Sequence, residues 1–398
     1  MDTTTKIIGN WFHRDTIKIL SRAVRHFPVV LLTGPRQSGK TSLLRRFYPK
    51  HAYISLDVPS LAAQAEDNAE LFLEGIGSPV IIDEVQYAPS LFRAIKPVVD
   101  RHKKPGTFLL TGSQTFPLMQ GVSESLSGRC AILNLQSLSA AEIRRRRKAS
   151  EFDILVTGGF PELWKQHALP RDLWFSSYLA TYLERDIRNI LKVANLRDFE
   201  RFLRAAAART GQLLSYADMA RDVGIAVSTA RAWTSVLQAS GQVLLLEPYH
   251  RNLGKRLVKT PKLYFLDVGL AAFLNGIGNR SQLLASPLLG AMWETFVLGE
   301  VFRSGLAAGV TPRLWFWQNR LGHEVDIVID EGGRYRLAEM KFAERIGDSD
   351  LRGIRSFQEM YGVKNVAGAV VYCRTPHRHT VAPKITARHP ILHGVERP

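Results

Sequence analysis

The sequence predicts an α/β protein whose N-terminal part is a doubly wound parallel sheet, and three observations support this prediction. Apolar runs of strand length recur between residues 29 and 137. Segments with helical spacing separate these runs, which is the pattern of parallel strands joined by crossover helices. Near the C-terminus a strictly alternating run, Glu324–Ile329, precedes a second strand-like run, Tyr335–Lys341, and predicts a β-hairpin.

Composition limits the class of protein and the kind of partner. The chain has 398 residues, enough for two to four domains, and 45% of them are hydrophobic, as in a soluble globular protein. It carries 53 Lys and Arg against 36 Asp and Glu, which gives a formal charge of +17 and a pI near 10.0. This excess favours a polyanionic partner, with nucleic acid the leading candidate and an anionic membrane surface the alternative. Charge alone does not distinguish DNA from RNA.

Three features indicate a cytoplasmic protein without structural cross-links. No apolar run approaches the roughly 18 residues that span a bilayer, so we expect no membrane segment. The polar start, Met1–Thr5, is followed by a charged segment in place of an apolar signal core. Cys130 and Cys373 are far apart in the sequence and belong to no Cys/His cluster, so we expect neither a disulfide nor a zinc site.

The clearest motif runs from residue 34 to residue 41. It follows the apolar run Val29–Thr33 and fits GxxxxGK[ST] at every fixed position, with the residues Gly34, Pro35, Arg36, Gln37, Ser38, Gly39, Lys40 and Thr41. A glycine-rich turn between a strand and a helix directs backbone N–H groups toward phosphate. Lys40 would reach the β and γ oxygens, and the Thr41 hydroxyl would ligate Mg²⁺. The sequence therefore predicts an ATP site.

Two later strand ends complete this predicted site. Pro79–Glu84 is an apolar run that ends in two adjacent carboxylates, so Asp83 would hold the Mg²⁺ shell and Glu84 would polarise the attacking water. A third run, Thr107–Gln114, ends in polar residues, among which Ser113 would sense the γ-phosphate. Each could be an ordinary strand end with a polar cap, but three in this order favour an ATPase.

At this point the chain resembles a known group, the prokaryotic AAA+-type ATPases that carry a nuclease-like domain at the C-terminus. The resemblance runs from the phosphate loop to about residue 372, and its landmarks are Gly34–Thr41, Ile81–Glu84, Thr111–Ser113, Ser127–Arg129, Gly158–Pro161, Arg185–Asp186 and Pro261–Asp267. It implies an α/β fold with four parts: a P-loop ATPase core over residues 1–138, a helical lid over 139–198, a winged helix over 199–280 and a restriction-endonuclease-like domain over 281–398. It does not settle the biochemical task.

Two arginines are candidates for contact with the γ-phosphate. Arg129 follows the expected sensor strand and Arg185 lies in the expected lid. Either could act as an arginine finger or lid sensor, or could simply form a salt bridge, and we favour Arg129. A finger that acts across a subunit boundary would require a homo-oligomer.

The region over residues 139–198 has helical patterns rich in aromatic residues. We expect the aromatic residues to form a core, since a base-stacking platform would need them exposed; they are Trp164, Trp174, Phe175, Tyr178 and Tyr182. The run Arg144–Lys148 follows a capping box at Ser139 and Glu142 and reads as a solvated, basic helix end, with phosphate binding as the alternative.

The sequence pattern from residue 199 to about residue 275 predicts three helices and a hairpin. On the third helix Ala230, Trp233 and Leu237 share the inner face, which leaves Arg231 and Gln238 outside as candidates for base contacts. The hairpin flanks a basic segment that would contact backbone phosphates through Arg251, Lys255, Arg256 and Lys259. DNA binding is the favoured interpretation, and a protein-docking module is the alternative.

The last candidate site is a group of carboxylates. Strand alternation puts Asp326 on one face of the first strand and Glu339 and Lys341 on one face of the second. The pattern resembles the D…ExK core of the PD-(D/E)xK nucleases, with Glu294 matching their helix acid. The resemblance implies that Asp326, Glu339 and Glu294 hold Mg²⁺ or Mn²⁺ and that Lys341 orients or deprotonates the attacking water. The alternative is a salt-bridged hairpin in a catalytically silent fold, which would make the chain an ATP-controlled DNA- or partner-binding switch.

Overall fold

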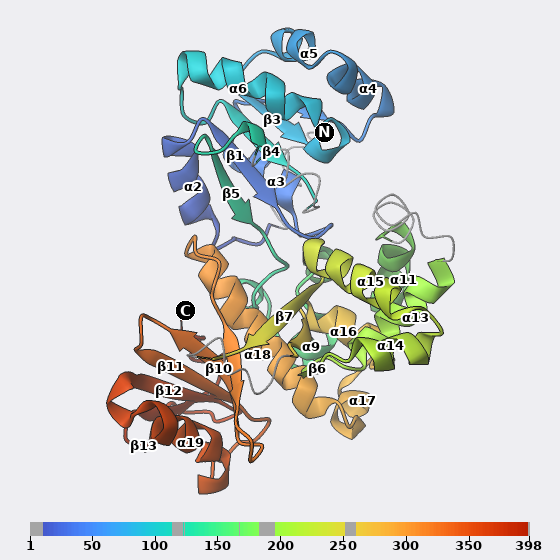
Figure 1. The fold of residues 1–398 in the computed structure, drawn as a ribbon. Coiled ribbons are helices and arrows are strands. Elements are labelled where there is room, and N and C mark those ends of the chain that lie inside the picture. The colour runs from blue at the N-terminus through green and yellow to red at the C-terminus, as the bar shows by residue number, and fades with distance from the viewer. Residues whose placement is uncertain are drawn as a thin grey trace.

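The computed structural model describes residues 11–113, 122, 124–166, 168–182, 196–250 and 260–396. The first sheet and its helices form an upper body in Figure 1, and the later helices and the second sheet lie below it. The basic segment of residues 251–259, Arg185 and Gln114 fall outside the described residues.

The upper body is a five-stranded sheet in the order β2-β3-β4-β1-β5, with all neighbouring strands parallel. Its strands are β1 (Val29–Thr33), β2 (Ala52–Ser55), β3 (Val80–Asp83), β4 (Phe108–Thr111) and β5 (Cys130–Asn134). The helices are α2 (Ile17–His26), α3 (Lys40–Phe47), α4 (Pro59–Asp67), α5 (Ala69–Ile76) and α6 (Ser90–His102), with a 3-10 turn, η1, at Val85–Tyr87.

Both faces of this sheet are covered, as the continuous apolar runs predict. Val29 and Leu31 of β1 belong to a hydrophobic cluster that includes residues of α4, α5 and α6. Val30 and Leu32 belong to a second cluster with residues of α2 and α3. The alternating side chains of one strand therefore serve two cores, and the predicted doubly wound parallel sheet is confirmed.

The next segment consists of short helices that pack on the lower body. They are α8 (Ala140–Arg144), α9 (Glu151–Thr157), α10 (Pro161–Lys165) and α11 (Arg171–Tyr182). Phe175 and Tyr178 are buried, Trp174 stacks on Tyr178 at a ring distance of 5.3 Å, and Trp164 packs against the same cluster, so these four residues form a core as expected. The side chain of Tyr182 lies outside the described residues. α9 and α11 contact α16 (Val268–Leu274).

Three helices and a hairpin follow, as predicted. They are α13 (Leu196–Ala207), α14 (Tyr216–Val223), α15 (Val227–Ala239) and the antiparallel strands β7 (Val243–Pro248) and β8 (Lys262–Phe265), with a short strand β6 (Gln212–Leu213) paired to β8. Ala230, Trp233 and Leu237 of α15 are buried, whereas Arg231 and Gln238 are exposed. The predicted inner and outer faces of α15 are therefore correct.

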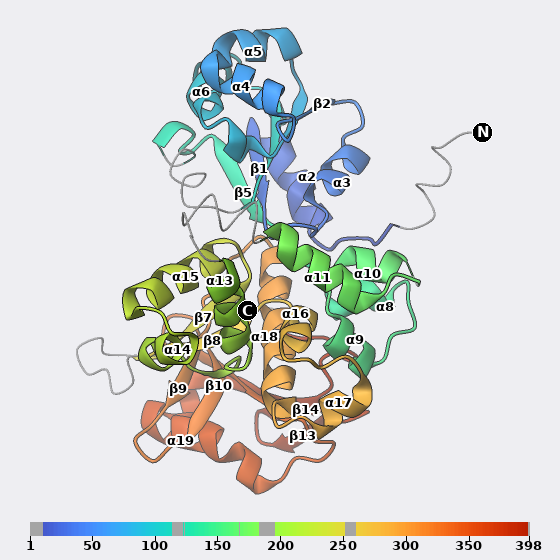
Figure 2. The ribbon, with the colours of Figure 1, turned by 90° about the vertical axis from the view of Figure 1, so that its right-hand side faces the viewer.

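The C-terminal elements place the predicted hairpin within a larger sheet. They are α17 (Arg280–Ala285), α18 (Leu289–Ala307), β9 (Trp315–Gln318), β10 (Glu324–Asp330), β11 (Tyr335–Met340), η4 (Asp348–Leu351), α19 (Arg352–Tyr361), η5 (Val363–Asn365), β12 (Val366–Tyr372), β13 (His379–Ala382) and β14 (Ile385–Arg388). β10 and β11 are antiparallel, whereas β11, β12 and β14 run parallel. Figure 2 shows α18 as a long helix through the lower body, rising to the base of the upper sheet, where it contacts α2.

The lower elements share one sheet and one core. Nine strands run in the order β13-β14-β12-β11-β10-β9-β7-β8-β6, in which β7 pairs in parallel with β9 through Glu247 and Pro248. A single hydrophobic cluster extends from Phe12 to Tyr372 and includes residues of α9, α11, α15 and α18. The core is thus continuous across the boundaries that we expected at 198/199 and 280/281, and the sheet is continuous across the second of them. Among the described residues, no helix is long and apolar enough to cross a membrane.

Candidate functional site

The phosphate loop lies at the carboxyl edge of the upper sheet. The Thr41 hydroxyl donates to Asp83 Oδ1 over 2.6 Å, and the Tyr53 hydroxyl donates to Asp83 Oδ2 over 3.1 Å. Thr111 at the end of β4 also donates to Asp83 Oδ1. The fold therefore brings together Thr41 and Asp83, the two residues that the sequence assigns to Mg²⁺.

The loop itself is built around a buried lysine and a required glycine. Lys40 Nζ donates to the carbonyl oxygens of Gly34 and Pro35 over 3.1 and 3.0 Å. Gly34 has φ +140°, and a Cβ at this position would lie 2.1 Å from the Leu135 carbonyl oxygen, so only glycine fits. Ser38 Oγ is buried and, among the described residues, has no hydrogen-bond partner. A buried hydroxyl and an ammonium in a glycine-shaped loop suit a phosphate ligand.

The two remaining predicted residues of this site lie at the adjoining strand ends. Glu84 has φ +57°, its N–H donates to Thr111 Oγ1 over 3.2 Å, and its carboxylate accepts from the Gln86 side chain. Ser113 Oγ is buried without a hydrogen-bond partner in the described part of the chain. Glu84 and Ser113 thus stand at the same edge of the sheet as Asp83, where the sequence places them.

Arg129 lies at the amino ends of the strands, whereas the phosphate loop lies at their carboxyl ends. It directly precedes β5, and its carbonyl oxygen accepts from Val29 N–H at the start of β1, whereas the phosphate loop follows the end of β1. Its guanidinium pairs with Asp100 of α6, with Nη2 3.0 Å from Oδ2. The fold does not bring Arg129 to its own phosphate loop, so only the role across a subunit boundary stays a prediction.

Arg14 touches the phosphate loop, and sequence reasoning missed it. Its Nη1 donates to the Ser38 carbonyl oxygen over 2.8 Å, its Nη2 to the Gln136 carbonyl oxygen over 2.6 Å, and its Nε to Glu142 over 3.1 Å. Both side chains of the Arg14–Glu142 pair are about 95% buried, with 6% and 5% exposed. The capping box at Ser139 was the only signal in this network that the sequence offered.

The same network continues to α18. The N–H of Ala140, in the first turn of α8, donates to both carboxylate oxygens of Glu300 over 3.2 and 3.1 Å. Glu300 also accepts from Arg303 Nη2 over 2.6 Å, and Arg303 Nη1 donates to the Leu266 carbonyl oxygen just after β8. Buried polar contacts therefore join the phosphate loop to α18 and to the end of β8.

The C-terminal carboxylates form a second, separate cluster. The register of β10 and β11 pairs Ile327 with Ala338, so one further step places Asp326 opposite Glu339. Asp326 Oδ2 accepts from Met340 N–H over 2.7 Å. Glu339 Oε1 lies 2.7 Å from Lys341 Nζ, whereas its Oε2 is buried without a partner among the described residues. The predicted D…ExK residues are thus neighbours on one face.

Two residues of β8 join this cluster, a contact that the sequence analysis did not predict. Lys262 forms an ion pair with Glu324. The Tyr264 hydroxyl donates to Glu294 Oε2 over 3.2 Å. The site therefore combines residues of β8, α18, β10 and β11, from both sides of the boundary that we expected at residue 280.

The cluster holds more acidic than basic groups. Its acids are Glu294, Glu324, Asp326 and Glu339, against the ammonium groups of Lys262 and Lys341. Burial and the charge of Asp326 raise the pKa of Glu294 to about 8. Burial, with Glu324 nearby, raises the pKa of Asp326 to about 6. Burial and Asp326 also raise the pKa of Glu339 well above its ordinary value.

The expected metal site is present as a donor set but not as a formed ligand sphere. In the described part of the chain, no three His, Cys, Asp or Glu side chains are placed to hold a metal ion, so the assembled set of Glu294, Asp326 and Glu339 is not observed. The three acids come from two strands and a helix, and Tyr264, the Met340 amide and Lys341 each hold one oxygen of one acid. Buried carboxyl groups that outnumber the lysines still fit a divalent cation chemically.

Comparisons with known proteins agree with the upper site. Residues 26–144 match the family described as "AAA domain". Residues 149–281 and 289–384 match two families that are each described as "Domain of unknown function", DUF8612 and DUF4143. The DUF8612 match covers the expected lid and winged helix together.

Two curated relatives are similar over most of the chain, and two solved structures are similar at low identity. The uncharacterized proteins Rv2008c of Mycobacterium tuberculosis and Mb2031c of Mycobacterium bovis are each 34% identical over 339 residues, 82% of this chain and 73% of the relative. The Walker-type ATPase PABY2304 of Pyrococcus abyssi is 16% identical over 66% of this chain and 96% of its own, with a TM-score of 0.44. The DNA clamp loader delta protein of Bacillus subtilis is 12% identical over 56% and 87%, with a TM-score of 0.24. The chain therefore belongs to the family of the two mycobacterial proteins, and its upper body is an AAA domain of the P-loop ATPase type.

Proposed function

We propose that the chain couples ATP hydrolysis by its AAA domain to the processing of DNA, and that the C-terminal cluster cleaves phosphodiester bonds. The observation that carries the second part is the buried group of Asp326, Glu339 and Lys341, in which one carboxylate oxygen has no hydrogen-bond partner in the described structure. A salt bridge needs one acid and one base, whereas this cluster has acids in excess. A divalent cation and a phosphate ester would use both features.

At the nucleotide site, Mg²⁺ would neutralise charge on the β and γ phosphates of ATP. Thr41 and Asp83 would hold it, and their 2.6 Å hydrogen bond already sets the two side chains together. Lys40 would exchange the carbonyl oxygens of Gly34 and Pro35 for phosphate oxygens. Glu84, at the end of β3, would orient the attacking water.

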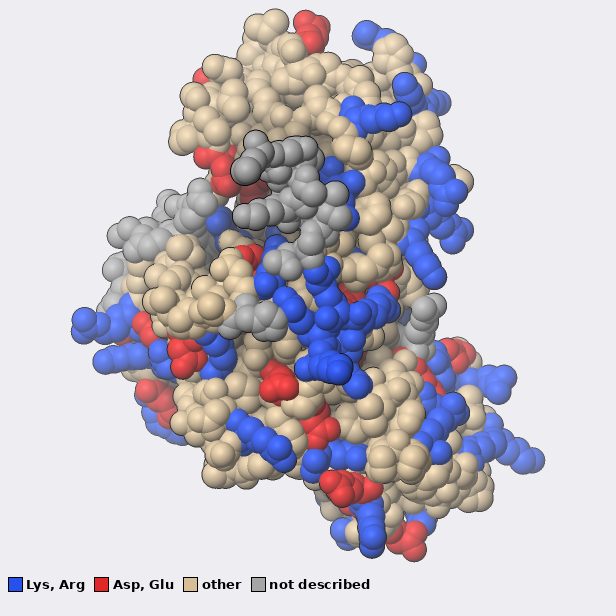
Figure 3. Space-filling model, turned by 180° about the vertical axis from the view of Figure 1, so that it is seen from behind, with Lys and Arg blue, Asp and Glu red and all other residues tan. Residues whose placement is uncertain are grey.

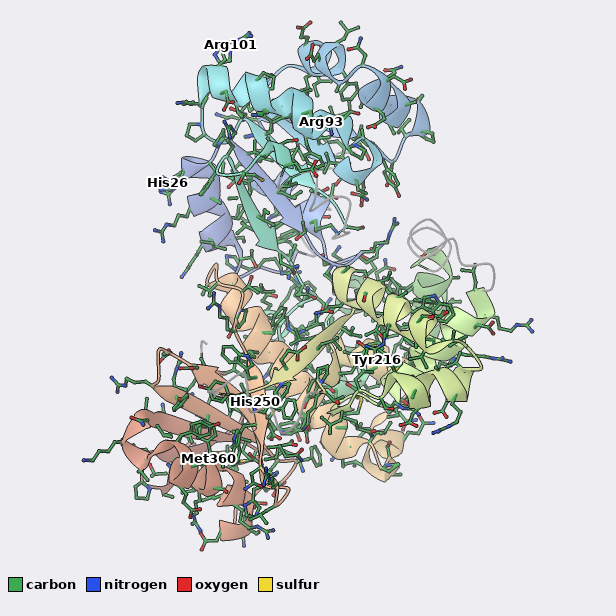
Figure 4. All side chains as sticks on the ribbon, in the orientation of Figure 1. His26, Arg93, Arg101, Tyr216, His250 and Met360 are labelled. Carbon is green, nitrogen blue, oxygen red and sulfur yellow. The ribbon has the colours of Figure 1, made fainter. Side chains whose placement is uncertain are left out.

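The DNA-binding part of the proposal is supported by topology and charge. The order helix, short strand, two helices and hairpin is that of a winged helix, in which α15 would be the recognition helix. Arg231 on its exposed face lies over the ring of Tyr216, 4.5 Å from the centroid, and Figure 4 shows Tyr216 among the helices of this region. Figure 3 shows Lys and Arg side chains gathered over the rear face of the molecule, in keeping with the charge of +17.

At the C-terminal site, Asp326 and Glu339 would hold Mg²⁺ or Mn²⁺, which would activate water and stabilise charge on the phosphate. Glu294 would support the metal from α18. Lys341 is the most accessible group of the core trio, with 35% of its side chain exposed, and Glu339, Asp326 and Glu294 raise its pKa despite burial. It would orient the water and the phosphate.

The decisive experiment is a cleavage assay with the full chain. Labelled single- and double-stranded DNA and RNA are incubated with Mg²⁺ or Mn²⁺, with and without ATP, and the Asp326→Asn variant is the matched control because it keeps the size of the side chain. We expect metal-dependent cutting by the parent chain and none by Asp326→Asn. Absence of cutting of every substrate under all conditions would overturn the nuclease proposal.

Binding is tested apart from cutting. Charge reversal of Arg251, Lys255, Arg256 and Lys259 should weaken DNA binding for all sequences and flatten its dependence on salt, as expected for phosphate contacts. Arg231→Ala and Gln238→Ala should instead alter sequence preference. An unchanged affinity and salt slope in the charge-reversal variant would favour a protein-docking role for this region.

A second function is favoured by the buried network between the two sites. Contacts through Arg14, Glu142, Glu300 and Arg303 join the phosphate loop to α18. We propose as the alternative an ATP-controlled switch, in which the nucleotide changes how α18 and the hairpin bind DNA or a partner and the C-terminal fold is silent. DNA affinity that differs between the ATP- and ADP-bound chain, without any cleavage, would support this alternative.

A further inference from the structure

The strand β8 forms one wall of the carboxylate cluster. Lys262 and Tyr264 are two residues apart, so both side chains project from the same face of β8. Both are buried, with 6% of Lys262 and none of Tyr264 exposed. The strands β7 and β9 lie between β8 and β10 in the sheet, so the two side chains reach the acids along one sheet face.

Each of these side chains is anchored to a different acid. Lys262 Nζ lies over the ring of Phe316 on β9, 5.4 Å from the centroid, and ends at Glu324 on β10. The Tyr264 hydroxyl ends at Glu294 on α18. A buried hydroxyl or ammonium is costly unless it has a partner, so these contacts fix β8 and the two acids relative to one another.

Glu294 is the acid whose position depends most on β8. It reaches the cluster from a helix, and no strand register fixes it opposite Asp326. Its Oε2 lies 3.2 Å from the Tyr264 hydroxyl, and Gly211 lies close by, where a Cβ would come within 3.4 Å of the same oxygen. Both neighbours belong to the segment from α13 to the end of β8, outside the C-terminal domain that the sequence predicts.

We propose that Tyr264 is a positioning residue for the C-terminal site, which holds the Glu294 carboxylate toward Asp326 so that the acids can share one divalent cation. This inference rests on the proposed metal-dependent function of the cluster. Hydrogen bonds that orient metal ligands commonly contribute about 10- to 100-fold to metal affinity. Loss of the Tyr264 hydroxyl should therefore weaken cation binding by about that factor.

The test measures Mn²⁺ binding to the full chain by calorimetry in the absence of nucleotide, so it does not depend on cleavage. Asp326→Asn defines the binding that belongs to this cluster. Tyr264→Phe removes only the hydroxyl. Tyr249→Phe is the matched control, because the Tyr249 hydroxyl also donates to a carboxylate, Asp330, over 2.8 Å in the same sheet but outside the cluster. We expect weaker Mn²⁺ binding in Tyr264→Phe and parent affinity in Tyr249→Phe.

A double-mutant cycle shows whether Tyr264 acts through Glu294. In a Glu294→Gln background, Tyr264→Phe should weaken Mn²⁺ binding no further. Two outcomes would overturn this inference alone. Either Tyr264→Phe leaves the Asp326-dependent Mn²⁺ binding unchanged, or Tyr249→Phe weakens that binding by the same factor. A parent chain without any Asp326-dependent Mn²⁺ binding would overturn the proposed metal site together with it.

Discussion

Replacement of Arg14 by methionine should destabilise the protein far more than the same replacement of Arg145. Both arginines pair with a carboxylate at the junction of the upper body and α8. The Arg14–Glu142 pair has 6% and 5% of its side chains exposed, whereas the Arg145–Asp15 pair has 47% and 40% exposed. Removal of one partner from a buried pair costs about 3–5 kcal/mol, and an exposed pair contributes at most about 1 kcal/mol.

Two opposing effects decide whether the loss of Arg14 costs this much. Glu142 keeps two other donors, Asp15 N–H at 2.7 Å and Ser139 N–H at 3.0 Å, which lowers the cost of leaving it unpaired. The Ser38 and Gln136 carbonyl oxygens, however, also lose the hydrogen bonds they accept from Arg14. We therefore expect the full 3–5 kcal/mol for Arg14→Met, about 6–20 °C in melting temperature for a cooperative unit of about 150–250 residues.

The assay is thermal unfolding of the parent, Arg14→Met and Arg145→Met, with and without MgATP. Arg145→Met should shift the melting temperature by at most about 4 °C. Arg14→Met should also lose part of the stabilisation by MgATP, because Arg14 holds the Ser38 carbonyl of the phosphate loop. Adding Glu142→Gln to Arg14→Met should recover part of the loss. Equal shifts for the two single variants would refute the argument that burial sets the cost.

The remaining predictions concern turnover, assembly and pH. Lys40→Ala should abolish tight ATP binding by calorimetry, while Glu84→Gln should bind ATP but release no phosphate; a parent rate in Glu84→Gln would remove this residue from the mechanism. A mixture of Arg129→Ala and Lys40→Ala subunits should recover some ATP hydrolysis. A mixture as inactive as each variant alone would count against an arginine finger that acts across the subunit boundary. Hydrogen bonds from His389 and Arg374 hold the pKa of Glu151 below its ordinary value of 4.5 despite burial. Its contribution to stability is therefore complete above pH 4.5 and lost as the pH falls below it, so melting temperatures of Glu151→Gln should depend less on acid pH.

Sequence reasoning succeeded where a site is local. The phosphate loop is a contiguous motif, and the strands that carry Asp83 and Ser113 end at the same edge because parallel strands must. Helical spacing alone predicted which face of α15 is buried and which is exposed. The pairing of Asp326 with Glu339 followed from strand alternation and a short turn.

It failed where contacts join distant segments. Arg14 meets Glu142 across 128 residues, and Lys262 meets Glu324 across 62, and no pattern in the sequence links the two partners. Tyr264 read as one of several apolar strand residues. The position of Arg129 relative to the phosphate loop depends on which end of β5 it occupies. The three acids lie on two strands and a helix, and they form a ligand sphere only if their hydrogen bonds to other groups orient them toward one point.

The nine-stranded sheet has a practical consequence for anyone who wishes to divide this protein. A fragment of residues 281–398 would lose the strand that pairs with β9 and would present a bare sheet edge, a template for aggregation. It would also lose Lys262 and Tyr264, leaving four acids with a single lysine. We therefore expect that the C-terminal part cannot be excised or transplanted by itself, and that the portable unit extends at least from α13 to β14.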